Sequence, residues 1–172
     1  MQFIIELQAD HLTAIMEAAR RAIATPREML TSIGEELQQA NQERHRQGLD
    51  PEGRPWQELA ESTKKAGPRK GGPLNRTGRM LRNFHYQADN DSVRLGFDGG
   101  DGFPAIYHQE GSSAHVITAR RAKALKFGGL YRKRVNHPGL PARPLIGFPD
   151  SDRRRVEEVI VDHLTQVINA VR

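Results

Sequence analysis

The seven histidines have the widest chemical range of any residues in this chain, because an imidazole can transfer protons or bind metal near neutral pH. They stand at positions 11, 45, 85, 108, 115, 137 and 163. None forms the H-E-x-x-H spacing that places two metal ligands on one face of a helix. The chain has no cysteine, which excludes disulfides and thiolate sites. We therefore expect each histidine to be a surface or hydrogen-bonded structural residue.

Two further groupings resemble reactive sites only in part. Ser112 and Ser113 stand beside His115, but the glycine-flanked turn that exposes a hydrolase nucleophile is missing. Asp98 and Asp101 lie in a glycine-rich turn that would suit calcium, yet the remaining ligands of an EF-type loop are absent. The sequence thus predicts no enzyme activity, no cofactor and no metal site.

The loop Gly67–Pro73 combines glycine and proline with Arg69 and Lys70. A glycine-rich basic loop can cradle phosphate, but this one lacks the order of glycine, lysine and serine or threonine that opens a helix in a P-loop. Non-specific contact with DNA phosphates requires only charge and reach. This loop is therefore a candidate contact surface rather than a nucleotide site.

Helices are predicted at both ends of the chain, where apolar residues recur three or four positions apart. The first pattern runs from Asp10 to Ile23, and the second from Pro26 to about Arg46. A third amphipathic pattern starts at Asp150 or Ser151 and continues to Val171. A short strand, Phe3–Leu7, is predicted before the first helix.

The middle of the chain reads as strands and turns. Alternating apolar residues around the Asn90-Asp91 turn predict one β-hairpin, from Phe84 to Phe97. A strand over His115–Thr118 and a second hairpin, Lys123–Val135 with a Gly-Gly turn, follow. The run HPGLPARP cannot be helical, because proline fixes φ and removes a backbone donor. It is expected to be a rigid connector into the last helix.

These elements predict an α+β fold made of one domain over residues 1–172. N-terminal helices and a C-terminal helix would pack on a small, mainly antiparallel sheet built by the two hairpins, with the basic hairpin protruding. No segment approaches the roughly 18 apolar residues needed to cross a membrane, and the N-terminus lacks the features of a signal peptide. The protein is expected to be neither exported nor membrane-bound.

The net charge of +5 is unevenly distributed. Residues 1–60 carry 6 basic and 10 acidic side chains, whereas residues 61–148 carry 16 basic and 6 acidic ones. Such asymmetry suits contact with nucleic acid or with an acidic protein ring. It also suits solvated lysines and arginines that keep hairpin edges from aggregating. Composition alone leaves these readings open.

Trp56 and Arg143 each have two interpretations. Trp56, the only tryptophan, is expected to close the edge of the core, with an interface anchor as the alternative. Arg143 stands between Pro141 and Pro144. It could meet a carboxylate of a neighbouring copy, for example Glu35, Glu36 or Glu43, or bind carbonyl groups at a helix end within its own chain.

Two blocks of sequence together resemble the phage virion morphogenesis family, which includes tail-completion and head–tail joining proteins. The first is DPEGRPWQELAESTKK followed by LNRTGRMLRNF, and the second runs from YHQEG through HVITARRAKALKF to VNHPGLPARPLIGF. The resemblance covers about residues 48–148. It implies a structural protein of the virion tail or neck, assembled in the host cytoplasm and acting without chemistry.

The resemblance also implies partners. These are other neck and tail proteins, namely connector, tail-tube or terminator subunits, and further copies of the chain in a closed ring. The alternative is a DNA-contacting accessory protein that uses the basic hairpin. The candidate interface residues are Trp56, Arg69, Lys70, Tyr107, His108, Arg120, Arg121, Lys123, Lys126, Arg132, Lys133, Arg134, His137 and Arg143.

Overall fold

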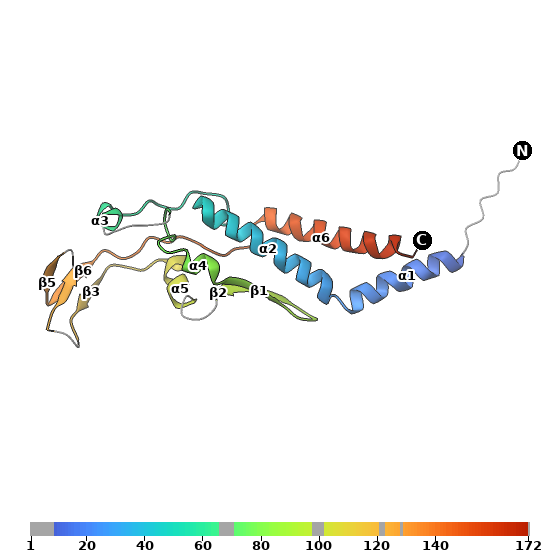
Figure 1. Cartoon of the computed structure of the whole chain (residues 1–172), viewed down its shortest axis with the longest axis horizontal. Helices are drawn as coiled ribbons and strands as arrows, with labels where there is room; N and C mark the ends of the chain where they lie inside the picture. The colour runs from blue at the N-terminus through green and yellow to red at the C-terminus, as the bar shows by residue number, and fades with distance from the viewer. Residues whose placement is uncertain (1–8, 66–70, 98–101, 121–122, 128, 172) are drawn as a thin grey trace, which may run out of the picture. The chain divides into compact units, whose positions relative to one another are not determined.

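The computed structural model of the chain describes residues 9–65, 71–97, 102–120, 123–127 and 129–171 (Figure 1). The long helices are α1 (Ala9–Ala24), α2 (Arg27–Gln47) and α6 (Asp150–Asn169). The short helices are α3 (Glu61–Lys64), α4 (Arg79–Arg82) and α5 (Gly102–Glu110). The strands are β1 (Phe84–Ala88), β2 (Val93–Phe97), β3 (His115–Thr118), β4 (Leu125–Phe127), β5 (Leu130–Arg132) and β6 (Arg134–His137).

The α+β class and the antiparallel pairing are confirmed, but the described strands do not form one sheet. They form three two-stranded sheets, β1-β2, β3-β6 and β4-β5. The prediction of a single sheet was therefore wrong. The predicted strand Phe3–Leu7 lies outside the described residues.

The second hairpin is shorter than predicted, and its charges explain why. β4 and β5 pair with Leu125 opposite Arg132. Continuing this register would put Lys123 opposite Arg134, and like charges directly across a ladder are destabilising. The chain instead bends at Lys133 and starts β6, where Val135 pairs with Ile117 of β3. That apolar β-branched pair, and β6 itself, were not foreseen. That the basic hairpin protrudes remains a prediction.

The chain divides into two compact units. Unit 1 comprises residues 1–37, 86–94 and 150–172, and holds α1, the first half of α2, and α6. Within it α1 packs on α6, and Ala18, Ile33 and Leu37 are buried. Gly34 leaves room for the ring of Tyr86, which an added methyl group would overlap.

Two polar contacts tie the elements of unit 1 together. The Tyr86 hydroxyl donates to Glu35 Oε1 over 3.2 Å. Arg155 of α6 pairs with Glu36 of α2, with Nη1 and Oε1 2.6 Å apart. The two carboxylates on the middle of α2 are thus engaged within their own chain.

Unit 2 comprises residues 38–85 and 95–149. Its apolar centre is formed by Trp56, Ala105 and Leu145, against which four partly buried side chains pack: Leu74, Met80, Phe97 and Ile146. Phe84 and Phe97 place the two strands of the first hairpin in contact, with ring centroids 5.1 Å apart. In the described part of the chain no helix is long and apolar enough to span a membrane.

Candidate functional site

The proline-rich connector of residues 138–149 is held in unit 2 by side chains that bond its backbone. Trp56 is 7% exposed, and its indole Nε1 donates to the carbonyl of Pro144 over 2.9 Å. His45, near the end of α2, meets the indole edge-on, with centroids 5.3 Å apart. Trp56 thus lies in the core, as in the first of its two interpretations, and its N–H has the partner that a buried indole needs.

Gln109 of α5 makes the most complete set of bonds to the connector. Its amide nitrogen donates to the carbonyl of Ile146 over 2.8 Å. Its amide oxygen accepts from the backbone N–H groups of Leu145 and Ile146 over 2.8 and 3.1 Å. Three backbone polar groups are satisfied by one side chain, in the manner of an added strand.

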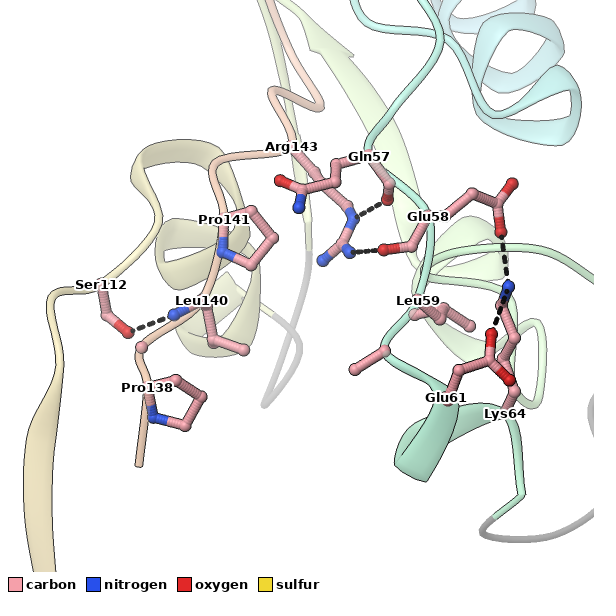
Figure 2. Close-up of a pocket in the computed structure, with 12 residues that line it drawn as sticks. Gln57, Glu58, Leu59, Glu61, Lys64, Ser112, Pro138, Leu140, Pro141 and Arg143 are labelled. Atoms are coloured by element: carbon pink, nitrogen blue, oxygen red, sulfur yellow. Dashed lines mark hydrogen bonds and ion pairs between the residues drawn. The ribbon is translucent and has the colours of Figure 1, made fainter. Parts of the chain in front are cut away.

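Arg143 lies inside unit 2 with only 4% of its surface exposed. Its Nε donates to the carbonyl of Gln57 over 2.9 Å and its Nη2 to the carbonyl of Glu58 over 3.1 Å (Figure 2). Burial lowers the pKa of this guanidinium, while the nearby Glu58 carboxylate raises it. An arginine remains charged under such shifts, so both hydrogen bonds have a charged donor.

Of the two interpretations of Arg143, bonding within its own chain is the one observed. The carbonyl groups belong, however, to a segment without regular secondary structure before α3, and not to a helix end. The Arg143 N–H also donates to the carbonyl of His108, over 2.6 Å. An additional contact with a neighbouring copy remains a prediction.

The segment 57–64 and the connector form the two walls of an open groove of about 700 Å³ (Figure 2). Leu59 and Leu140 supply apolar surface, and Lys64 bridges the carboxylates of Glu58 and Glu61 at 3.4 and 3.2 Å. Those two ion pairs hold the pKa of Lys64 above its usual value. One wall of the groove is therefore polar, with its charged side chains paired, and the other wall is rich in proline.

Just before β3 and just after β6, two segments of the chain approach closely through their backbones. Ser112 and Leu140 exchange N–H···O bonds of 2.9 and 3.0 Å. Gly111 and Gly139 have positive φ, 75° and 92°, and a Cβ at each would meet backbone atoms of the facing segment. Only glycine combines that φ with such contact at little cost.

Beyond this point β3–β6 and β4–β5 form two ribbons, together called the ribbon segment (residues 115–137). Every residue of β3 and of β5 is exposed, including Val116, Leu130 and Tyr131. His115 and His137 are cross-strand partners with stacked rings 5.0 Å apart. The ribbon segment thus presents apolar and aromatic side chains to solvent on both of its faces.

The basic candidates of the ribbon segment are exposed, and their side chains pair with no described residue. They are Arg120, Lys123, Lys126, Arg132, Lys133 and Arg134. No acid occurs anywhere in residues 111–149, which contain eight lysines and arginines. Arg69, Lys70 and Arg121 lie outside the described residues. Among the described residues, the ribbon segment is thus a cationic surface whose charges have no acidic partner.

The remaining candidates lie on α5, near the connector. Tyr107 is 46% exposed and His108 is half-buried. Burial lowers the pKa of His108, and the charge of Arg143 lowers it further. Within the described residues no three histidine, aspartate or glutamate side chains are close enough to hold a metal ion. The arrangement bonds and positions segments of backbone.

A model of the phage virion morphogenesis family matches residues 7–165. The chain belongs to this family. The match confirms the resemblance carried by the two sequence blocks and extends it into α1 and α6. Membership makes the protein a phage structural and assembly protein associated with the virion. No curated protein and no solved structure matches the chain significantly.

The family blocks acquire a physical meaning from this geometry. Trp56 stands in the first block, whereas Gln109 and Arg143 stand in the second. These three side chains bond the backbone of the other block or of the connector. The sequence drew attention to Trp56 and Arg143 but not to Gln109, because a glutamine that bonds backbone leaves no spacing signal. Its place in the YHQEG motif was the available signal.

Proposed function

We propose that this protein completes the phage tail or joins the tail to the head at the neck, as a subunit of a closed ring and without catalysing a reaction. Its partners in this proposal are other copies of the chain and connector, tail-tube or terminator subunits. Family membership supplies the assembly role.

The observation that carries the proposal is the exposure of the ribbon segment. Val116 and Leu130 are 47% and 56% exposed, and Tyr131 is 72% exposed. Isolated two-stranded ribbons are marginally stable in water, and contiguous exposed apolar surface commonly marks an interaction site. A subunit that buries this surface against a partner gains free energy that the single chain lacks.

A particle assay tests the proposal. Deleting the gene from its phage should yield filled heads and separate tails that fail to join, or tails with abnormal ends, as seen by electron microscopy. Supplying the wild-type protein to an extract of such a lysate should restore infectivity. Normal joined particles from the deletion would refute the proposal.

One observation favours the second candidate, a DNA-contacting accessory role. The absence of any acid from residues 111–149 gives the ribbon segment a charge suited to phosphates. The affinity for DNA would then fall steeply as the salt concentration rises. The slope of log affinity against log salt concentration would be close to the number of phosphate contacts. A joining subunit without this role would bind duplex DNA weakly, and loss of that binding would change assembly little.

A further inference from the structure

We infer that the ribbon segment of one copy docks on the exposed acidic face of α6 of a second copy. The inference rests on the proposed ring and names the surfaces that would close it. The ribbon segment offers six basic side chains that pair with no described residue, interleaved with Val116, Leu130 and Tyr131. Its occupant must therefore offer both negative charge and apolar surface.

The second half of α6 meets both requirements. Residues 156–169 contain Glu157, Glu158 and Asp162 and no lysine or arginine. All three carboxylates are exposed, and none pairs with a described residue. Val161, 61% exposed, lies among them. A helix turns by about 100° per residue, so these side chains fall within roughly 140° of its circumference. Arg154, one turn earlier, is exposed in the same arc, so the acidic surface begins at Glu157.

The carboxylates of α2 that were considered as partners of Arg143 already have partners within the chain. Glu35 accepts from Tyr86, and Glu36 pairs with Arg155. Glu43 pairs with Arg46 and accepts from Gln47. A ribbon docking on α2 would have to displace these intrachain contacts, whereas Glu157, Glu158 and Asp162 of α6 have no described contact to displace. The carboxylates of α6 are thus better placed to receive a partner than those of α2 first considered for Arg143.

Double-stranded DNA is the competing occupant, since its phosphates would also neutralise the basic side chains. Phosphates would leave Val116 and Leu130 in water, however, whereas Val161 and the stems of the α6 acids would cover apolar surface. Because ribbon and α6 are different surfaces, their contact is heterologous, and repetition of such a contact closes a ring when the rotation permits.

Charge reversal on each surface tests the inference. The ribbon variant carries Arg132→Glu and Arg134→Glu, and the helix variant carries Glu158→Lys and Asp162→Lys. The control carries Lys65→Glu and Arg76→Glu, two exposed bases of unit 2 outside the ribbon segment. Circular dichroism checks that each full-length chain folds, and sedimentation velocity measures assembly of each at several concentrations.

The wild type and the control should assemble with the same dissociation constant. Either reversal alone places like charges together and should weaken assembly about tenfold or more. Mixing the two variants should restore assembly, because each ribbon then finds a helix of opposite charge at both junctions. One chain carrying all four substitutions should also assemble with itself.

Other outcomes would overturn the inference in distinguishable ways. Rescue in the fourfold chain but not in the mixture would place the contact within one copy. Unchanged assembly of both reversals, with loss of duplex-DNA retention by the ribbon variant only, would make DNA the occupant. A wild type that remains a monomer at every concentration would remove the ring itself. The head and tail phenotype of the gene deletion tests the assembly role independently.

Discussion

Arg143 and the arginines of the ribbon segment are the same residue type in opposite surroundings. Arg143 is 4% exposed and has charge-assisted hydrogen bonds to two backbone carbonyls. Arg132 and Arg134 are exposed, and neither side chain pairs with a described residue. The comparison shows that the arginines in the middle of the chain are of two kinds, buried and hydrogen-bonded or exposed. One arginine is bonded within its own chain, while the others are exposed and pair with no described residue.

Aromatic substitutions should show the largest difference between these regions. Trp56→Ala should lower the free energy of unfolding by about 3–5 kcal/mol, because it empties the centre of unit 2 and removes the bond to Pro144. Tyr131→Ala, on the ribbon segment, should change it by no more than about 0.5 kcal/mol. Urea unfolding followed by circular dichroism measures both. Similar losses in the two variants would contradict the division.

Arginine substitutions should show a smaller difference in the same direction. Arg143→Ala should cost about 2–3 kcal/mol, since it leaves the carbonyls of Gln57 and Glu58 without their charged donor. Arg143→Lys should cost less than alanine but should not restore the wild type, because lysine lacks the guanidinium fork. Arg132→Ala should stay within about 0.5 kcal/mol.

A particle-joining assay on the same arginine preparations sharpens this result. If Arg143 acts within its own chain, the folded fraction of Arg143→Ala should join heads to tails normally despite its lower melting temperature. An unchanged melting temperature with impaired joining would instead assign Arg143 to an interface.

The smallest expected effect is a dependence of stability on pH. Burial lowers the pKa of His45 from its ordinary value of 6.5, so the unfolded chain takes up a proton at a pH where the folded chain does not. Stability should therefore fall as the pH drops below about 6.5, until the folded-state pKa is passed. His108, also lowered by burial, acts in the same direction.

Unfolding in urea at pH 7.5 and pH 5.5 measures this dependence. His45→Phe retains a ring against Trp56 but cannot be protonated, so its stability should differ less between the two conditions than that of the wild type. A variant that loses as much stability on acidification as the wild type would exclude His45 as a source of the effect.

Local patterns predicted the elements of this fold better than their pairing. The spacing of apolar residues predicted α1, α2, α6 and the β1–β2 hairpin with nearly their observed bounds. The partner of β3 could not be read in this way, because β6 is only four residues long and lies in a run of basic residues. The predicted hairpin over residues 123–135 would have paired Lys123 with Arg134, and this unfavourable pair of like charges was a sign in the sequence that the hairpin is shorter.

The candidate site was predictable only where a residue type is rare or constrained. Trp56 stood out as the single tryptophan, and Arg143 stood out between two prolines. Which surroundings Arg143 would have was not readable, because its partners are carbonyl groups 85 and 86 residues away in sequence. Gln109 offered even less, since its partners are also backbone groups.

Because these side chains bond backbone groups, only one partner of each hydrogen bond depends on residue type. Trp56, Gln109 and Arg143 each bond backbone groups. Every residue provides a backbone carbonyl, and every residue except proline provides a backbone N–H. Substitutions at Gln57, Glu58 or Ile146 can therefore leave these hydrogen bonds intact, whereas a change at Trp56, Gln109 or Arg143 removes them. The sequence can accordingly change along the connector and still form the same hydrogen bonds, provided that the tryptophan, the glutamine and the arginine keep their positions.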